Sequence, residues 1–569
     1  MSGPKTFVEV LRDRAVSREL GNGFKFLLDG EGREEHLDYA NLDRRAREVG
    51  QILAARARPG ERALLVFDPG LDYVVTLFAC FYAGVVAVPA YPPNPLRPEA
   101  GLAQLERVAS DSQASLALGS ADLLTHLRPL LANAPWAQAL QWVDLDASGA
   151  DRAALPEVAA EDTAIIQYTS GSTSDPKGVV VTHRNLIANA GFIREAFGLS
   201  TSSRAVSWLP PHHDMGLMGG IIQPVFLGID MVLFSPQLFI QRPLTFLEAI
   251  TKFRLTGGGS PNFGYELLTR RVPESAKERL DLSTWEVAFC GAEPVRASTL
   301  DAFAAAFAVC GFRREAFLPC YGLAEATLLV TAVAPSDEPR RLSLDAASLD
   351  AGLVVPAAGD SAPRLFVSCG RPPQGLTVSI VDPESMKPQG EGRVGEIWVK
   401  GPNIAAGYWR KPVPTAAAFG ASVQGGEGGY LRTGDLGFIE GGELFVTGRL
   451  KDLIIIRGRN LHPQDIEATV EHAHQNVRPG RSIAFSAEIE GDERLIIVCE
   501  VARRILLDPV PTQEAVRRAV ASAHGIAPHE VLLLEPSRLP RTSSGKPRRS
   551  LSRERYLAGR LGEVVEAFE

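Results

Sequence analysis

Short runs of Val, Ile and Leu, bounded by turn residues, alternate along the first two-thirds of the chain with longer amphipathic segments. Such runs are typical of strands buried on both faces of a largely parallel sheet. The amphipathic segments 39–54 and 244–253 predict helices that cover such a sheet. This part of the chain is therefore predicted to be α/β. The clearest strand candidates are residues 63–67, 85–88, 164–168, 231–234 and 287–290.

The pattern changes after Leu453. Strands predicted at 495–501 and 531–534, with a helix near 513–524, indicate a smaller α+β unit. We place the boundary at 449–452, which gives a large domain over 1–450 and a small domain over 451–569. Residues 334–365 are rich in Ala, Pro, Asp and Ser, with little periodicity beyond the apolar run 353–355, and are interpreted as an irregular insertion.

One uncharged stretch, residues 73–96, is long enough to span a bilayer. Gly84, Pro89 and the proline cluster at 92–95 would break a spanning helix. A buried helix over 74–83 followed by a buried strand over 85–88 accounts for every residue. We therefore expect a protein that is not integral to a membrane.

Composition narrows the class of protein further. With 569 residues, of which 45% are apolar, the chain can bury more than one core. The net charge of −8 argues against a nucleic-acid partner, because phosphate neutralisation needs a clustered excess of Lys and Arg. The one basic stretch, 538–555, is consistent either with a solvated face or with an anionic ligand.

The cysteines lie at least ten residues apart, so no metal-binding or redox spacing exists. They are interpreted as small core residues. No charged and apolar leader marks the N-terminus, and reduced thiols fit a cytoplasmic protein. The six are Cys80, Cys290, Cys310, Cys320, Cys369 and Cys499.

The densest polar cluster follows the predicted strand at 164–168. Its Gly and hydroxyl residues offer backbone N–H groups and hydroxyls to phosphate oxygens, and Lys177 adds a positive charge. It is not a Walker loop, because Pro176 precedes the lysine and Gly178 follows it. An exposed Ser/Thr turn is the alternative. The cluster contains Thr169, Ser170, Gly171, Ser172 and Thr173.

Further motifs follow this loop in a fixed order. Together with the loop they resemble the adenylate-forming superfamily of acyl-CoA synthetases, adenylation domains and luciferases, and the resemblance spans nearly the whole chain. The motifs lie at residues 208–216, 291–294, 321–327, 395–397 with 407–408, 432–435, 448–452 and 541–546.

The resemblance implies a large α/β domain with mostly parallel sheets flanked by helices, a small β subdomain, and a small mobile α+β C-terminal domain. It also implies ATP and Mg²⁺. The substrate carboxylate is already a nucleophile, so positioning and electrostatic stabilisation carry the catalysis. By resemblance Thr169 and Glu325 hold the metal, and a hydroxyl with a hard carboxylate suits Mg²⁺.

The nucleotide site is assigned by the same resemblance. Tyr321 stacks on adenine, with core packing as the alternative. Asp435 accepts the ribose hydroxyls beside Arg449, and local capping is the alternative for this carboxylate. The remaining ATP or AMP contacts are assigned to Thr169, Ser170, Gly171, Ser172, Thr173, Lys177, Gly291, Ala292, Glu293, Pro294, Gly322, Leu323 and Ala324.

Two lysines are assigned to the small domain. Lys546 resembles the catalytic lysine that reaches the α-phosphate and the carboxylate, although Pro547 stands where the family commonly has an apolar residue. An exposed lysine in a basic tail is the alternative. Lys451 aligns with the family's hinge.

Three features favour the fatty acyl-AMP ligase branch. The motifs at 90–93, 213–216 and 261–266 have its texture, and the insertion at 334–365 resembles the segment that holds the small domain away from the CoA-dependent arrangement. We expect this insertion to pack between the two domains, with the run 353–355 as its apolar contact. No acidic residue apart from Asp214 is placed to pair with an α-amino group. By resemblance His213 is catalytic, and an acyl chain contacts His213, Met215, Gly216, Met218, Gly258 and Phe263, which are alternatively ordinary core and turn residues.

The implied reaction joins a medium- or long-chain fatty acid to AMP and releases pyrophosphate. The acyl group then passes to the phosphopantetheine of an acyl carrier protein acting in trans, as in lipid, polyketide or lipopeptide biosynthesis. A long-chain acyl-CoA ligase is the enzymatic alternative. A binding module that keeps the fold would require losses among Thr169, Glu325, Asp435 and Lys546, and all four are present.

Replacing Lys546 with Ala is expected to lower adenylation by several orders of magnitude without unfolding the chain, because the residue acts only on the reacting charges. Carboxylate-dependent exchange of pyrophosphate into ATP measures the rate. Lys5→Ala, outside every motif, is the control. Equal rates for the Lys546 variant and the wild type would remove the role.

Overall fold

The computed structural model describes residues 3–17, 22–93, 98–132, 134–144, 151–168, 176–359, 363–456, 459–489, 492–503, 505, 508–541 and 547–561. Most of the predicted phosphate loop and the predicted catalytic lysine lie outside these ranges. The residues concerned are Thr169, Ser170, Gly171, Ser172, Thr173 and Lys546.

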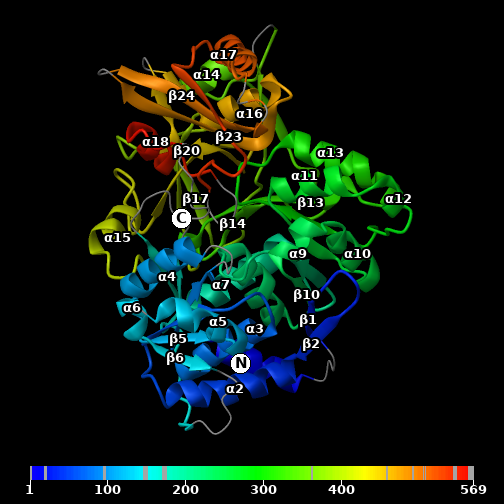
Figure 1. Ribbon diagram of the computed structural model, residues 1–569, viewed down its shortest axis with the longest axis vertical. Coiled ribbons are helices and arrows are strands. Elements are labelled where there is room, and N and C mark those ends of the chain that lie inside the picture. The colour runs from blue at the N-terminus through cyan, green and yellow to red at the C-terminus, as the bar shows by residue number, and fades with distance from the viewer. Residues whose placement is uncertain are drawn as a thin grey trace.

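An eight-stranded sheet forms one half of the body of the molecule (Figure 1). Its six inner strands pair in parallel, and the strand at each edge is antiparallel to its neighbour. In spatial order they are β14 (Leu329–Ala332), β13 (Phe317–Gly322), β12 (Val287–Cys290), β11 (Gly257–Gly259), β9 (Arg204–Ser207), β10 (Asp230–Phe234), β1 (Gly23–Leu27) and β2 (Glu34–Asp38).

A six-stranded sheet forms the other half. It is parallel except for the pairing of β7 with β8, which are joined by the segment that holds the predicted phosphate loop. Its order is β6 (Gln141–Asp144), β5 (Leu116–Gly119), β3 (Arg62–Val66), β4 (Val86–Ala90), β7 (Thr163–Tyr168) and β8 (Gly178–Thr182).

The largest core lies between these two sheets. Every residue of helix α3 (Leu71–Ala83) except Asp72 is buried, and the helix shares this core with Leu65 of β3 and Met231 of β10. Gly84 ends the helix in the left-handed conformation and lets the chain turn directly into β4. The stretch tested for a membrane span is therefore a buried helix and strand. No helix within the described residues is long and apolar enough to cross a membrane.

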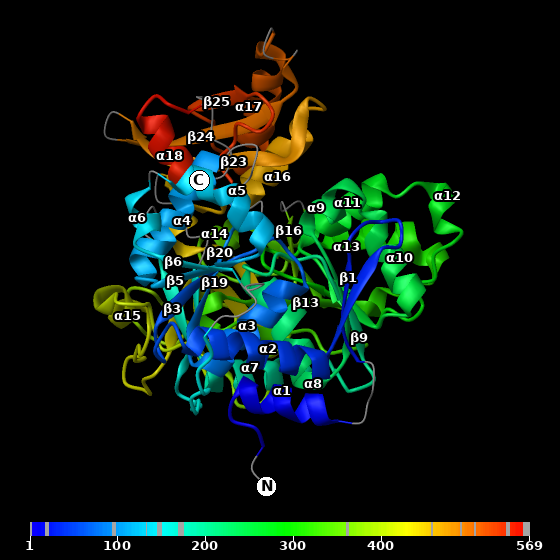
Figure 2. The ribbon, with the colours of Figure 1, turned by 60° about the horizontal axis from the view of Figure 1, so that its bottom comes forward.

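Helices cover both sheets (Figures 1 and 2). Side-chain caps fix several starts: Asp38 accepts from the N–H of Asn41 at α2, and Thr182 and Asn185 form a reciprocal capping box at α7. The helices are α1 (Phe7–Val16), α2 (Tyr39–Ala54), α4 (Pro98–Ser112), α5 (Ala121–Leu131), α6 (Pro135–Gln138), α7 (His183–Ala196), α8 (Gln223–Leu227), α9 (Pro236–Gln241), α10 (Leu244–Phe253), α11 (Asn262–Arg271), α12 (Glu274–Lys277) and α13 (Ala297–Phe307).

A four-stranded antiparallel sheet follows, and with it a two-stranded pair. The pair, β15 with β16, lies within and just beyond the segment predicted to be an irregular insertion, so that interpretation was wrong in part. Each of these strands has only five residues, and alternation of apolar and polar side chains over so short a segment is not recognisable in the sequence. The elements are β15 (Arg341–Asp345), α14 (Ala346–Asp350), β16 (Pro363–Val367), β17 (Thr377–Val381), β18 (Gly395–Lys400), α15 (Pro412–Ala418), β19 (Leu431–Glu440) and β20 (Glu443–Arg449).

The C-terminal region contains a three-stranded sheet with its own apolar clusters (Figure 1). Val516 and Val520 of α17 pack against Ile497 of β24 in one of them. The elements are β21 (Ile454–Ile456), β22 (Arg459–Leu461), α16 (Pro463–Ala473), β23 (Val477–Ile489), β24 (Asp492–Val501), α17 (Val510–His524), β25 (Glu530–Leu534) and α18 (Arg549–Leu557).

The predicted α/β class is confirmed, as are the named strands and helices. Helices α2 and α10 have the predicted bounds, and each named strand agrees to within three residues at either end. Agreement is closest where burial on both faces or a clean amphipathic stripe dominates the sequence.

Candidate active site

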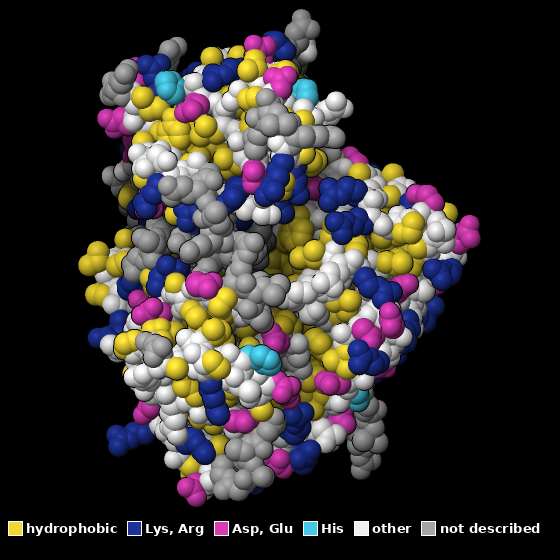
Figure 3. Space-filling view, in the orientation of Figure 1, with side chains coloured by type: hydrophobic (Ala, Val, Ile, Leu, Met, Phe, Trp, Pro, Cys, Tyr) yellow, Lys and Arg dark blue, Asp and Glu magenta, His cyan; other side chains and the backbone are white. Residues whose placement is uncertain are grey.

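A cavity of about 2750 Å³ runs between the body and the C-terminal region. Figure 3 shows the molecule hollowed there, with hydrophobic side chains inside and Lys and Arg side chains on the rim. Residues from both large sheets, from the four-stranded sheet and from the C-terminal region line it. A cavity with such varied walls can hold a ligand with polar and apolar parts.

Most of the predicted site residues that the structure describes meet at this cavity. The exceptions are Gly216, Met218, Gly258 and Gly291, which are not on its wall; Met218, for example, packs in the core between the sheets. Those on the wall are Lys177, His213, Met215, Phe263, Ala292, Glu293, Pro294, Tyr321, Gly322, Leu323, Ala324, Glu325, Asp435, Arg449 and Lys451.

Asp435 is the centre of a polar cluster on this wall. The β19–β20 hairpin places it opposite Arg449, whose Nε donates to Asp435 Oδ1 at 3.0 Å. The Tyr321 hydroxyl donates to Asp435 Oδ2 at 2.7 Å. Each carboxylate oxygen keeps a further lone pair for a ligand hydroxyl. The carboxylate raises the pKa of Arg449, and burial raises the pKa of Tyr321.

Glu325 lies in the single 3₁₀ turn η4 (Ala324–Ala326). Its Oε1 accepts a hydrogen bond from the Tyr408 hydroxyl at 2.8 Å. The turn ends at Thr327, whose φ of +63° is unusual for a residue with a branched Cβ. Buried Asn403 holds this strained turn by donating to the carbonyls of Ala326 and Leu329 at 3.0 and 2.9 Å.

Three cations lie on the same wall as the carboxylates of Asp435 and Glu325. They are Lys177, Arg449 and Lys451. Lys177 Nζ lies 5.1 Å from the centre of the Tyr408 ring. Burial and the neighbouring Arg449 lower the pKa of Lys451. A binding anion would offset this unfavourable environment, because an opposite charge favours the protonated amine. The cluster is suited to a polyphosphate.

Mg²⁺ fits this donor set. Within the described residues no three His, Cys, Asp or Glu side chains gather into a metal site. Mg²⁺ commonly uses one or two protein oxygens and completes its shell with phosphate and water. Glu325 supplies such an oxygen, whereas the second predicted ligand, Thr169, lies outside the described residues.

His213 is held by its neighbour. Asp214 Oδ1 lies 2.6 Å from His213 Nδ1 and also accepts from the N–H of Met215 at 2.8 Å. These residues begin a π-helix, η1 (Met215–Ile222). At Gly216 a Cβ would overlap the carbonyl oxygen of Pro210, which explains the glycine. The imidazole is therefore fixed on the cavity wall through Nδ1, leaving Nε2 for a ligand.

An apolar groove leaves the polar cluster between α9 and α11. Phe263 and Ile240 line it with 39% and 52% of their surfaces exposed, which is high for large apolar side chains. Trp208 braces the inner end: its ring stacks on Phe239 at 4.0 Å and meets Phe263 edge-on at 5.6 Å. The groove is suited to an alkyl chain.

Sequence reasoning missed the supporting side chains. It included Tyr408 in a motif without a role, and it assigned none to Asn403, Asn262 or the Asp214 clamp on His213. An Asn directly after a Pro was the available signal for Asn403 and Asn262, because an Asn amide at such a position often hydrogen-bonds to nearby backbone. Which backbone it contacts depends on the tertiary fold.

A cluster of cations and carboxylates that is suited to a polyphosphate, joined to an apolar groove, defines an enzyme of the adenylate-forming class. Residues 18–409 match the family of AMP-binding enzymes, and residues 451–565 match the AMP domain of Disco-interacting protein 2-like proteins. Two bacterial ligases and a solved structure are also similar to this chain over nearly their whole lengths. The chain belongs to the AMP-binding enzyme family, and within it to the fatty acyl-AMP ligases.

The medium-chain-fatty-acid–[acyl-carrier-protein] ligase JamA of Moorena producens is 41% identical over 99% of this chain and 97% of its own. The ligase TtuA of Teredinibacter turnerae, with the same description, is 33% identical over 95% and 93%. The crystal structure of a fatty acid AMP ligase from Legionella pneumophila is 39% identical, covers 98% and 97%, and has a TM-score of 0.76.

Replacing Glu325 with Gln is expected to weaken Mg²⁺-dependent turnover, because a neutral amide is a poorer ligand for a hard cation. Tyr408→Phe, which removes the hydrogen bond that orients the carboxylate, should raise the Mg²⁺ concentration for half-maximal activity roughly 10-fold. Titration of pyrophosphate exchange with Mg²⁺ measures both, with exposed Glu384→Gln as control. An unchanged metal dependence in Glu325→Gln would make Glu325 structural.

Proposed function

We propose that this enzyme uses ATP to convert a medium- or long-chain fatty acid into acyl-AMP and then transfers the acyl group to an acyl carrier protein. The observation that carries the proposal is the continuity of one cavity from the Asp435 cluster to the groove at Phe263. The descriptions of JamA and TtuA support both the acid and the carrier.

In the proposed first step a carboxylate oxygen attacks the α-phosphorus of ATP, and the bond to the pyrophosphate oxygen breaks. Lys177, Arg449 and Lys451 offset the negative charge of the phosphates. His213, held by Asp214, orients the carboxylate at the inner end of the groove. Glu325, with Thr169 as the second ligand predicted from the sequence, would hold Mg²⁺, which would polarise phosphate oxygens as a Lewis acid.

The nucleoside portion of ATP is assigned to the Asp435 cluster. Asp435 accepts the ribose hydroxyls with the lone pairs that Tyr321 and Arg449 leave free. The Tyr321 ring and the backbone of Ala292, Glu293 and Pro294 frame the adenine. The proposed second step breaks the acyl-AMP bond: the phosphopantetheine sulfur attacks the acyl carbonyl and AMP leaves.

We further propose that residues 451–569 form a small domain that turns about Lys451 and brings Lys546 to the reacting charges. The support is a separate set of apolar clusters beyond residue 454. Arg549, whose side chain is 11% exposed, joins this region to the hinge: it contacts Asp452 at 3.1 Å and Glu467 at 2.6 Å. The cytoplasm, with reduced thiols, is the proposed compartment.

The insertion contacts the C-terminal region through charges. Arg364 lies 2.9 Å from Asp350 and 3.2 Å from Asp465 of α16, and Arg459 of β22 lies 3.3 Å from Asp350. The apolar run 353–355 was expected to make this contact, and that expectation was wrong. Val354 instead packs against the apolar cluster that holds Phe438 and Phe445, both fully buried, of the β19–β20 hairpin in the body.

The function is tested by pyrophosphate exchange across a series of saturated acids, followed by competition between CoA and a carrier protein for the acyl-AMP. We expect exchange to be fastest with medium or long chains and the acyl group to pass to the carrier. If none of the fatty acids supported pyrophosphate exchange, the proposal would be contradicted. Preferential transfer of the acyl group to CoA would favour an acyl-CoA ligase.

Replacing Arg364 with Met is expected to raise acyl-CoA formation while acyl-AMP formation persists. Without the guanidinium, the carboxylates of buried Asp350 and half-buried Asp465 repel each other and loosen the contact with the C-terminal region. A change of about 1.4 kcal/mol in the free-energy difference between the two domain arrangements would change the ratio of their populations tenfold.

Both products are measured from one preparation with saturating CoA. Arg340→Met is the matched control, since Arg340 lies in the same segment but bonds to the Glu440 carbonyl of the body at 2.8 Å. A folded Arg364 variant that makes acyl-AMP and still ignores CoA would place the block elsewhere.

A further inference from the structure

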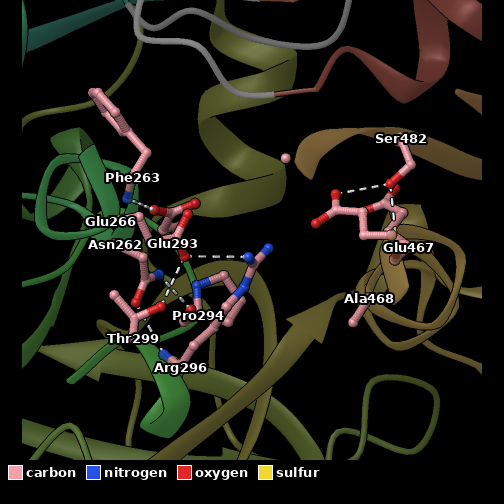
Figure 4. A network of polar contacts seen from close by, with 12 residues as sticks. Asn262, Phe263, Glu266, Glu293, Pro294, Arg296, Thr299, Glu467, Ala468 and Ser482 are labelled. Atoms are coloured by element: carbon pink, nitrogen blue, oxygen red, sulfur yellow. Dashed lines mark hydrogen bonds and ion pairs between the residues drawn. The ribbon is translucent and has the colours of Figure 1, made fainter. Parts of the chain in front are cut away.

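Asn262 joins two parts of the cavity wall that are far apart in the sequence. It begins α11, which forms one side of the apolar groove, and it is 1% exposed. Its Nδ2 donates to the carbonyl of Pro294 at 2.9 Å, and its Oδ1 accepts from the N–H of Arg296 at 3.0 Å. Figure 4 shows this one amide between the helix and the loop.

The loop that Asn262 holds is strained. It leaves β12 and frames the proposed adenine site, and Ala292 within it has a φ of +70°. A non-glycine residue pays for this conformation and keeps it only when its surroundings enforce it. The Asn262 amide provides that enforcement two to four residues further along, where it pairs with the loop backbone as a neighbouring strand would.

A second hydrogen bond joins the same two parts. Glu293, the residue after Ala292, accepts from the N–H of Phe263 through Oε1 at 3.4 Å. Phe263 follows Asn262 directly and places its ring on the groove wall. A shift of the loop therefore moves the first turn of α11, and a shift of that turn moves the loop.

We propose that Asn262 is a positioning residue that couples the nucleotide site to the acyl groove, so that ATP and the fatty acid each strengthen the binding of the other. This inference rests on the proposed function. The ligand that binds first orders the loop and the start of α11. The second ligand then binds more tightly, because its part of the cavity wall is already ordered. Because the coupling is an equilibrium property, it has the same size in both directions.

The test measures binding without turnover. Calorimetry gives the Kd of α,β-methylene-ATP with and without saturating decanoate, and the Kd of decanoate with and without the nucleotide. In the wild type we expect each ligand to tighten the other by at least about 5-fold, the lower end of usual coupling. In Asn262→Ala the ratio should fall close to 1.

Thr299→Val is the matched control. Thr299 of α13 donates to Glu266 of α11 at 2.8 Å, so this variant removes a polar contact of the same helix. It leaves in place both the bonds from Asn262 to the loop and the ion pair of Glu266 with Arg296 at 3.6 Å. It should keep the wild-type ratio. If Asn262→Ala fails to fold, Glu293→Gln tests the coupling instead, because it weakens the hydrogen bond from the Phe263 N–H. In this variant the ratio of the Kd values without and with the other ligand should fall below the wild-type ratio.

The outcomes separate the two proposals. Equal ratios in the wild type and the folded variants, or a wild-type ratio of 1 with both ligands bound, would overturn the coupling and leave the proposed function standing. A wild type that binds neither the nucleotide nor decanoate would instead overturn the proposed function. Loss of coupling in Thr299→Val as well would show that general loosening of α11 is responsible and would overturn the role of Asn262.

Discussion

The buried carboxylate of Asp435 is the point at which the parts of the active site are fixed relative to one another. Its two oxygens bind Tyr321, from the eight-stranded sheet, and Arg449, at the end of the four-stranded sheet. A 6% exposed carboxylate is costly without such partners. Because Arg449 lies two residues before Lys451, the same interaction sets where the chain leaves the body.

The rest of the cavity wall uses strain held by buried amides. Thr327 and Ala292 both have positive φ angles, and each lies in a short segment that a buried asparagine grips by its backbone. Asn403 holds the turn that contains Glu325, and Asn262 holds the loop that contains Glu293. Hydrogen bonds of this kind give the site one geometry, since each buried amide would otherwise be left unsatisfied.

The two ends of the cavity are held by different forces. Near the nucleotide site, cations and carboxylates dominate, and their interactions weaken with salt where they are exposed. Along the groove, aromatic stacking of Trp208 on Phe239 fixes the wall. Between the insertion and the C-terminal region, the contact is a set of charged pairs around Arg364. Such pairs are specific in geometry and add little net stability, which suits a contact that must break and form.

The sequence by itself determined the α/β class, most of the central strands and the order of the motifs, because burial on both faces leaves an unbroken apolar run that short-range pattern reveals. It also identified Asp435, Arg449, Tyr321 and Glu325 as site candidates. Only the tertiary structure decided that Met218 and Gly258 lie off the cavity wall, that β15 and β16 pair within and just beyond the insertion, and which backbone groups Asn262 binds. These depend on contacts between residues far apart in the chain, whose partners no local pattern specifies.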